Sequence, residues 1–154
     1  MMNPQDIEAM MREAMYEGRK ALPQCQPNPP VGCVLVREGV IIARGYTNTP
    51  GCDHAEAMAL RQVHGDLRDA SAFVTLEPCS FHGRTPSCAK ALVQRRIGRV
   101  FVGILDPHPR NQGAGIDILR AAGIPVLTGI LEDEVRHDLA PYLFGKNTRD
   151  ATTE

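Results

Sequence analysis

The sequence of 154 residues contains no tryptophan, and aromatic residues make up only 5% of it. It also has no excess of either charge, because 17 basic and 18 acidic residues leave a formal net charge of −1. Proteins that bind nucleic acids usually depend on a basic surface and on aromatic side chains that stack on bases. The composition therefore argues against a nucleic-acid partner, gives no general attraction to an anionic membrane, and favours a small-molecule ligand.

Long apolar runs are missing as well, since no stretch of about 18 consecutive apolar residues occurs. The N-terminal segment is amphipathic and charged, unlike the core of a signal peptide. We therefore expect no membrane contact and a cytoplasmic location. The five cysteines are odd in number and widely spaced, which does not fit a secreted disulfide framework. Cys25, Cys33 and Cys52 have no assigned role, although Cys33 falls within an expected strand, where a buried structural thiol is the simplest interpretation.

The length and a hydrophobic content of 43% predict one compact domain, which we place at residues 1–145, followed by a flexible tail over 146–154. Apolar periodicity predicts an initial hairpin and then strands alternating with helices, hence an α/β fold with a mixed sheet. The third helix is expected to have Thr85 as its N-cap and Pro86 as its first residue. The expected helices span about 4–20, 54–64, 86–95, 114–122 and 132–138, and the expected strands span 31–36, 40–46, 70–76, 99–105 and 124–129.

The most informative motif is His54-Ala55-Glu56, which is followed by Cys79 and Cys88. One histidine and two cysteines can provide three ligands of a tetrahedral zinc ion and leave the fourth position to water, whose pKa zinc lowers toward about 7. Glu56, beside the histidine, can carry protons between such a water and a substrate. His54 and Cys88 fall near the expected starts of two helices, where the helix dipole favours the thiolate that zinc requires.

Two other interpretations of this motif remain open. A structural zinc site usually has four protein ligands with closely paired cysteines, whereas eight residues separate Cys79 from Cys88. Cys52, two residues before His54, could nevertheless be a fourth ligand that closes the site. Alternatively, the histidine and the cysteines are unrelated core residues, which their joint pattern argues against.

The segments PNPPVGCVLV, GCDHAEAMAL, LEPCSFHGRTPSC and DPHP occur in an order that resembles the cytidine-deaminase-like superfamily. More narrowly, they resemble the deaminase domain of the riboflavin-biosynthesis pyrimidine deaminase/reductase, over about residues 5–145. The resemblance implies a three-layer α/β/α sandwich around a mixed five-stranded sheet. It implies Zn²⁺ bound by His54, Cys79 and Cys88, with Glu56 as the catalytic proton carrier. It also implies a homo-oligomer, either a dimer or a tetramer.

The resemblance further implies contacts with a substrate. Asn28 matches a position that contacts the pyrimidine in this family, and its amide offers donors and an acceptor, although it could be a simple turn residue. Arg84 matches a basic position beside the substrate and could meet a phosphate or a carbonyl, or could be a solvated loop charge. Asp106, in the DPHP turn, is expected to contact the substrate. We expect the backbone of Ala55 to position water or an oxyanion.

Four residues depart from the family pattern around the expected pocket. Thr47 and Phe81 stand where the family commonly has histidines, His108 replaces an asparagine, and Ser87 replaces a proline. The metal ligands and the proton carrier are intact, so the departures predict altered recognition of the substrate, in which Thr47, Phe81 and His108 are candidate contacts. Phe81 could stack on a flat heterocycle that has fewer polar substituents. The family's reductase domain would begin where this chain ends, so we expect either a separate reductase polypeptide or a different pathway.

These observations predict a zinc-dependent hydrolytic deaminase that removes an exocyclic amine from an aminopyrimidine. The specific substrate that we expect is the phosphoribosylated diaminopyrimidine of riboflavin biosynthesis. A deaminase of another small N-heterocycle or nucleotide is one alternative. A nucleic-acid-editing deaminase is another, for which Arg95, Arg96 and Arg99 offer a small basic cluster. A third is a noncatalytic, zinc-stabilised interaction domain, against which Glu56 argues because a structural site has no use for a proton carrier.

Overall fold

The computed structural model describes residues 2–83 and 85–143, and within these ranges it contains one five-stranded sheet with the order β2-β1-β3-β4-β5. In this order, β1 is antiparallel to both of its neighbours, β2 and β3. The strands β3, β4 and β5 are parallel to one another. The mixed sheet predicted from the sequence is therefore confirmed. The strands are β1 (Gly32–Arg37), β2 (Val40–Tyr46), β3 (Ala70–Leu76), β4 (Arg99–Ile104) and β5 (Val126–Leu127).

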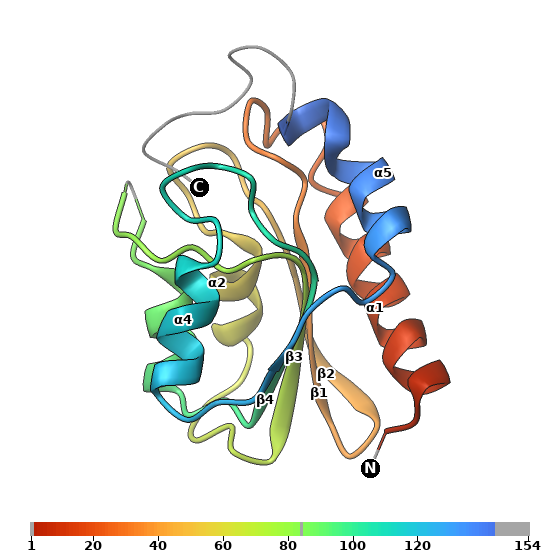
Figure 1. Cartoon of the computed structure of the whole chain (residues 1–154), viewed down its shortest axis with the longest axis vertical. Coiled ribbons are helices and arrows are strands. Elements are labelled where there is room, and N and C mark those ends of the chain that lie inside the picture. The colour runs from red at the N-terminus through yellow and green to blue at the C-terminus, as the bar shows by residue number, and fades with distance from the viewer. Residues whose placement is uncertain (1, 84, 144–154) are drawn as a thin grey trace.

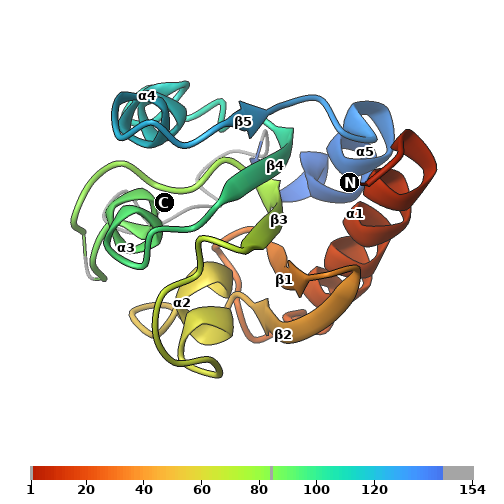
Figure 2. The ribbon, with the colours of Figure 1, turned by 90° about the horizontal axis from the view of Figure 1, so that it is seen from below.

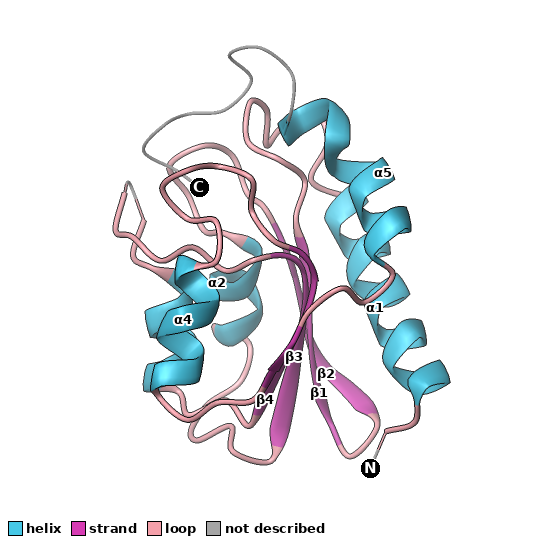
Figure 3. Cartoon of the chain, viewed as in Figure 1, coloured by secondary structure: helices cyan, strands magenta, loops and turns pink. Residues whose placement is uncertain are grey.

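Helices cover both faces of the sheet and make three layers (Figures 1, 2 and 3). One face is covered by α1 (Pro4–Arg19) and α5 (Glu132–Leu143). The opposite face is covered by α2 (Ala55–Leu60), α3 (Cys88–Gln94) and α4 (Ala114–Ala121). The α/β/α sandwich implied by the resemblance is thus confirmed. At the centre of the sheet, the rings of Phe73 and Phe101 stack in parallel on neighbouring strands, with centroids 4.4 Å apart.

The first helix follows from its local sequence. The side chain of Asn3 accepts a hydrogen bond from the backbone N–H of Asp6 at 2.8 Å, and Pro4 is the first helical residue, in agreement with the helix expected over about 4–20. Met11, Ala14 and Met15 are buried against the sheet, which leaves a charged face outward. None of the helices in the described ranges is long and apolar enough to cross a membrane.

Three expected elements have different bounds in the structure. The helix expected over 54–64 ends at Leu60, because the N–H groups of Gln62 and Val63 bond three rather than four residues back, Gln62 to the carbonyl of Ala59. The strand expected over 124–129 contains only two paired residues, and Gly129 then turns the chain with a φ of 81°. The last helix continues to Leu143 rather than ending near 138.

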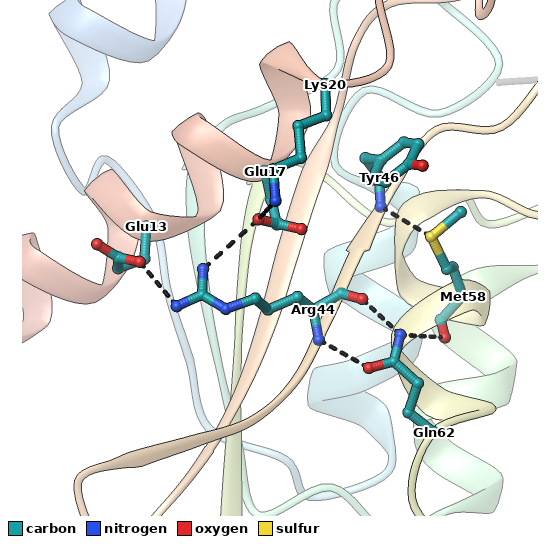
Figure 4. Close-up of polar contacts among 7 residues, drawn as sticks. All are labelled: Glu13, Glu17, Lys20, Arg44, Tyr46, Met58 and Gln62. Atoms are coloured by element: carbon teal, nitrogen blue, oxygen red, sulfur yellow. Dashed lines mark hydrogen bonds and ion pairs between the residues drawn. The ribbon is translucent and has the colours of Figure 1, made fainter.

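Side chains from α2 and the turn after it cover the outer edge of β2 (Figure 4). The amide of Gln62 accepts from the N–H of Arg44 at 3.1 Å and donates to the carbonyl of the same residue. The N–H of Tyr46 donates to the sulfur of Met58 at 3.4 Å. These contacts satisfy backbone groups that an edge strand would otherwise expose, and they attach α2 to the sheet. The guanidinium of Arg44 also pairs with two glutamates of α1, Glu13 and Glu17.

Candidate metal centre

The start of α2 places two functional side chains at the end of the sheet where β3 and β4 finish. His54 is the N-cap of the helix and Glu56 is its second residue, and both side chains are buried. The helix lies very close to β2 at this point, since a Cβ on Gly45 would stand 2.1 Å from the carbonyl oxygen of Ala55. Only glycine permits that approach, so Gly45 helps to fix where His54 and Glu56 lie.

The two cysteines come from the loop after β3 and from the start of α3. The expectation that Thr85 caps this helix and that Pro86 begins it is wrong. Ser87 is the N-cap instead, because its hydroxyl accepts from the N–H of Lys90 at 3.2 Å and donates to the carbonyl of Cys79 at 2.8 Å. The helix therefore begins at Cys88 itself. The predicted position of Cys88 in the first turn is confirmed.

His54, Cys79 and Cys88 form a compact, buried group of donor atoms. The Nδ1 atom of His54 lies 3.7 Å from the sulfur of Cys79 and 3.5 Å from that of Cys88. A tetrahedral zinc ion with ordinary bond lengths has sulfur-to-nitrogen ligand separations of about 3.6 Å, so the group fits that ion. It is the one group of three such donors that the described residues bring within 4.8 Å of one another. Cys52 is exposed and does not belong to it, which argues against a closed four-ligand site.

Hydrogen bonds around the cluster favour the thiolate form of Cys79, which is the form that binds a metal. The N–H of Cys88 donates to the sulfur of Cys79 at 3.2 Å, and hydrogen bonds from Cys88 and His54 lower the pKa of the Cys79 thiol to about 5 against the opposing effect of burial. Burial tends to lower the pKa of His54, but its hydrogen bond to Cys79 and the charge of that thiolate raise it overall. On the other side of the ring, Nε2 of His54 lies 3.2 Å from the hydroxyl of Thr85. Sequence reasoning missed this role of Thr85.

Glu56 is poised to exchange protons. Burial, reinforced by the charge of Cys79, raises the pKa of its carboxyl group to about 7. A carboxyl group with such a pKa can both take up and give up a proton at neutral pH.

A pocket opens beside His54 and Glu56, and it includes two of the predicted substrate contacts, Asn28 and Thr47. The hydroxyl of Thr47 accepts from the N–H of Val31 at 3.0 Å, and the backbone N–H of Thr47 donates to the carbonyl of Val31 at 3.1 Å. Thr47 thereby holds the loop that carries Asn28 against the pocket. The lining residues are Asn28, Pro29, Val31, Thr47, His54, Glu56, Leu76 and Glu77.

Glu77 is a buried carboxylate that the sequence did not single out. It accepts four backbone hydrogen bonds of 2.9 to 3.2 Å from the segment after β4 and from the first turn of α4. The sequence feature that could have identified Glu77 is its position as an acidic residue directly after a buried strand and before Pro78-Cys79. Glu77 thus fixes the end of β3 relative to α4, and with it the loop that carries Cys79. The four N–H donors belong to Asp106, Gly113, Gly115 and Ile116.

The DPHP turn is tied to the same cysteine loop. Asp106 is fully buried, and one of its carboxylate oxygens accepts from the N–H of His108 at 3.0 Å. Farther along the turn, the side chain of Asn111 accepts from the N–H of Ser80 at 3.1 Å and donates to the carbonyl of Pro78 at 3.2 Å. In the structure, Asp106 therefore supports the turn, and a contact of Asp106 or His108 with substrate stays a prediction.

Phe81 lies two residues beyond Cys79, and the guanidinium of Arg110 stacks over its ring, 4.0 Å from the centroid. One face of the aromatic surface expected to meet a heterocycle is therefore covered by a cation. The predicted contact Arg84 and the expected tail over 146–154 lie outside the described residues.

A three-layer α/β/α sandwich with a His-x-Glu sequence at the start of one helix, and two cysteines brought to the same point, has the architecture and signature of the zinc-type deaminases. In agreement, residues 4–104 match the family model of the cytidine and deoxycytidylate deaminase zinc-binding region. The chain belongs to this family.

Comparison with individual proteins indicates which branch of this family the chain resembles. The riboflavin biosynthesis protein RibD of Chlamydia trachomatis is 43% identical over 134 residues, which are 87% of this chain and 36% of that protein. The structure of Acinetobacter baumannii RibD superimposes with a TM-score of 0.88 at 40% identity, over 92% of this chain and 40% of that one. The resemblance to the RibD deaminase domain is therefore confirmed. The chain spans about a third of the length of the curated relatives it matches.

A third match is a diaminohydroxyphosphoribosylaminopyrimidine deaminase/5-amino-6-(5-phosphoribosylamino)uracil reductase from Thermotoga maritima. It is 39% identical with a TM-score of 0.83, over 90% of this chain and 40% of that one.

Proposed function

We propose that this chain is a zinc-dependent hydrolytic deaminase and that its substrate is the phosphoribosylated diaminopyrimidine of riboflavin biosynthesis. The observation that carries the proposal is the buried donor group of His54, Cys79 and Cys88, with Glu56 beside it in one pocket. The names of the relatives support the choice of substrate, because they describe riboflavin biosynthesis and, in one case, a phosphoribosylaminopyrimidine deaminase.

In this proposal His54, through Nδ1, and the two cysteine sulfurs hold the metal. Bound zinc would lower the pKa of a water molecule and so make a nucleophile available at neutral pH. The hydroxyl oxygen of Thr85 accepts a hydrogen bond from Nε2–H of His54 and so stabilises the tautomer whose Nδ1 can bind a metal.

Glu56 carries the protons. Removal of an exocyclic amine requires one proton at the ring nitrogen and another on the departing ammonia, because an amide anion is a poor leaving group. The Glu56 carboxyl group lines the pocket next to His54, so it can take each proton from the attacking water and deliver both in turn. The N–H of Ala55, the first residue of α2, has no acceptor within its own helix and is suited to orient water or an oxyanion.

Asn28 and Thr47 lie in the pocket wall and are proposed to contact the heterocycle, with Phe81, Arg84, Asp106 and His108 as further candidates. We also propose a single deaminase domain at residues 1–145, a cytoplasmic location and a homo-oligomer.

The test is release of ammonia by the zinc-loaded protein from a panel of aminopyrimidines, aminopurines, pterins and their nucleotides. We expect the phosphoribosylated diaminopyrimidine to have the highest kcat/KM by at least about tenfold. A higher kcat/KM for another heterocycle would show that the proposed substrate is wrong but that the proposed reaction is right. No ammonia from any compound, with zinc fully bound, would favour a noncatalytic zinc-stabilised domain.

A further inference from the structure

Residues 28–31, the wall segment, form one side of the pocket that also contains His54 and Glu56. The segment belongs to no helix or strand, because β1 begins only at Gly32. Its two prolines have no N–H, so the first donors after them are the N–H groups of Val31 and Gly32. The attachment of the wall segment to the sheet therefore depends on what these two groups bind. The residues of the segment that line the pocket are Asn28, Pro29 and Val31.

Both N–H groups are bound by threonine hydroxyls, one from each side of β1, which lies between β2 and β3 (Figure 2). Thr47 directly follows β2, and its hydroxyl accepts from the N–H of Val31 at 3.0 Å. Thr75 lies within β3, and its hydroxyl accepts from the N–H of Gly32 at 3.1 Å. The backbone pairing of β1 with β3 has already ended at this point, so the side chain takes the place of a backbone acceptor.

The two hydrogen bonds are shielded from water, since Thr47 is 5% exposed and Thr75 is 3% exposed. The N–H of Val31 also lies 3.0 Å from the carbonyl of Pro29, but that carbonyl belongs to the wall segment itself and does not attach it to the sheet. A buried N–H group without an acceptor is unfavourable. Loss of either hydroxyl would therefore favour a shift of the segment toward another acceptor.

Helix α1 restricts the same segment from one side. A Cβ on Gly32 would stand 1.7 Å from the carbonyl oxygen of Ala14, and a Cβ on Gly18 would stand 2.7 Å from that of Pro30. Only glycine permits such an approach, which leaves the segment no room to move toward the helix. Between α1 and the two threonines, the wall segment has its position before a substrate arrives.

We propose that Thr47 and Thr75 are positioning residues, whose hydroxyls hold the wall segment as a preformed side of the substrate pocket. A wall that is fixed in advance lowers the entropy lost when the heterocycle binds, so the two hydroxyls act on substrate affinity. The chemical step depends on the donor group and on Glu56 and should change little. This assignment rests on the proposed function, which supplies the substrate.

The kinetic test uses the zinc-loaded protein and compares Thr47→Val and Thr75→Val with Thr47→Ser and Thr75→Ser. Valine keeps the branched shape and removes the hydroxyl, whereas serine keeps the hydroxyl. We expect each valine variant to raise KM for the phosphoribosylated diaminopyrimidine about fivefold or more, as loss of a buried hydrogen bond implies. The kcat and zinc content of both variants, and the KM of both serine variants, should stay within about twofold of the wild type.

Thr128→Val is the control, because Thr128 is exposed and directly follows β5. It should leave KM and kcat unchanged. Thr75 is not one of the described residues that line the pocket, so a rise in KM in its valine variant cannot come from a lost contact with substrate. An unchanged KM in Thr75→Val, a fall in kcat at constant KM, or a rise in KM that also occurs in the serine variants would overturn the proposal.

Amide hydrogen exchange separates this proposal from the proposed function, because it requires no substrate. We expect Thr47→Val to speed exchange at the N–H of Val31, and Thr75→Val at that of Gly32, each about tenfold or more. The serine variants should match the wild type. If these changes are seen while the wild type releases no ammonia from the pyrimidine, the positioning role stands and the substrate assignment fails. Equal exchange in the valine variants and the wild type would overturn the role of the two hydroxyls.

Discussion

At the scale of single residues, the two ring nitrogens of His54 face different neighbours. Nδ1 points to the sulfurs of Cys79 and Cys88, whereas Nε2 lies 3.2 Å from the hydroxyl of Thr85. A histidine that binds a metal through Nδ1 carries its proton on Nε2, so the threonine oxygen is the natural acceptor. The ligand and its support come from segments about thirty residues apart.

Thr85→Val should weaken zinc binding, because it keeps the shape of the side chain but removes the acceptor for the His54 proton. Loss of such a supporting hydrogen bond typically costs about tenfold or more in metal affinity. Competition with a chromophoric chelator measures the change, and Thr85→Ser, which keeps the hydroxyl, is the matched control. Equal zinc affinities of Thr85→Val and wild type would show that the hydroxyl does not support the ligand.

Glu56 predicts a pH dependence of stability in the metal-free protein. The pKa of Glu56 in the folded protein, about 7, lies above the value of about 4.5 for an unperturbed glutamate. The protonated side chain therefore contributes fully to the free energy of unfolding below pH 4.5, and this contribution is lost as the pH rises through 7. Glu56→Gln cannot ionise and avoids this loss. Urea unfolding should therefore show little difference between the variant and wild type at pH 5, and an advantage for the variant of up to about 3 kcal/mol at pH 8.

An exposed glutamate provides the control for this prediction. Glu8→Gln on the outer face of α1 should follow the wild type at both pH values. A constant difference between Glu56→Gln and wild type from pH 5 to pH 8 would contradict the raised pKa.

At the scale of elements, Glu77 connects the end of β3 to the segment that leads into α4. Glu77→Gln would point an amide N–H₂ group at backbone N–H donors and leave buried donors without an acceptor, so we expect a loss of about 2 to 4 kcal/mol in the free energy of unfolding. Urea unfolding measures it, with Glu134→Gln as the control because Glu134 is exposed on α5 and pairs with Arg12 on the surface. A loss below about 1 kcal/mol would mean that the carboxylate is not essential to this connection.

Elements with local determinants were predictable from the sequence. Asn3 and Pro4 set the start of α1, and the strands expected over 31–36 and 40–46 leave the hairpin turn between them, where Glu38 and Gly39 have positive φ in the structure; each feature depends on neighbouring residues only. The start of α3 was misplaced by two residues: Ser87 caps this helix through the N–H of Lys90, and its further hydrogen bond to the carbonyl of Cys79 is set by the fold. Sequence patterns contain no direct information on such tertiary partners.

In the candidate site, too, some residues could be predicted from the sequence and others could not. The donor residues His54, Cys79 and Cys88 could be predicted because the chemistry of a metal restricts residue type and spacing strongly. Glu77 could not, because its four backbone donors come from a segment about thirty to forty residues farther along the chain. The stack of Arg110 on Phe81 likewise joins two loops whose proximity only the fold establishes.

At the scale of the whole molecule, the five cysteines differ in accessibility, which predicts a stepwise reaction with a thiol reagent. Cys52 is exposed, whereas burial raises the pKa of Cys25 and raises that of Cys33 well above its ordinary value. In the zinc-loaded protein we expect about one fast thiol, and a chelator should add the two cysteines of the donor group. The last two should react only on unfolding. Three or more fast thiols with zinc bound would contradict the proposed ligands.

The most direct measurement of the central claim determines zinc content and ammonia release together for wild type and Glu56→Ala, with the phosphoribosylated diaminopyrimidine as substrate. We expect both proteins to bind one zinc ion, and the variant to release ammonia at least about a hundredfold more slowly, because it lacks the proton carrier. A zinc-loaded Glu56→Ala protein that releases ammonia at the wild-type rate would contradict the claim.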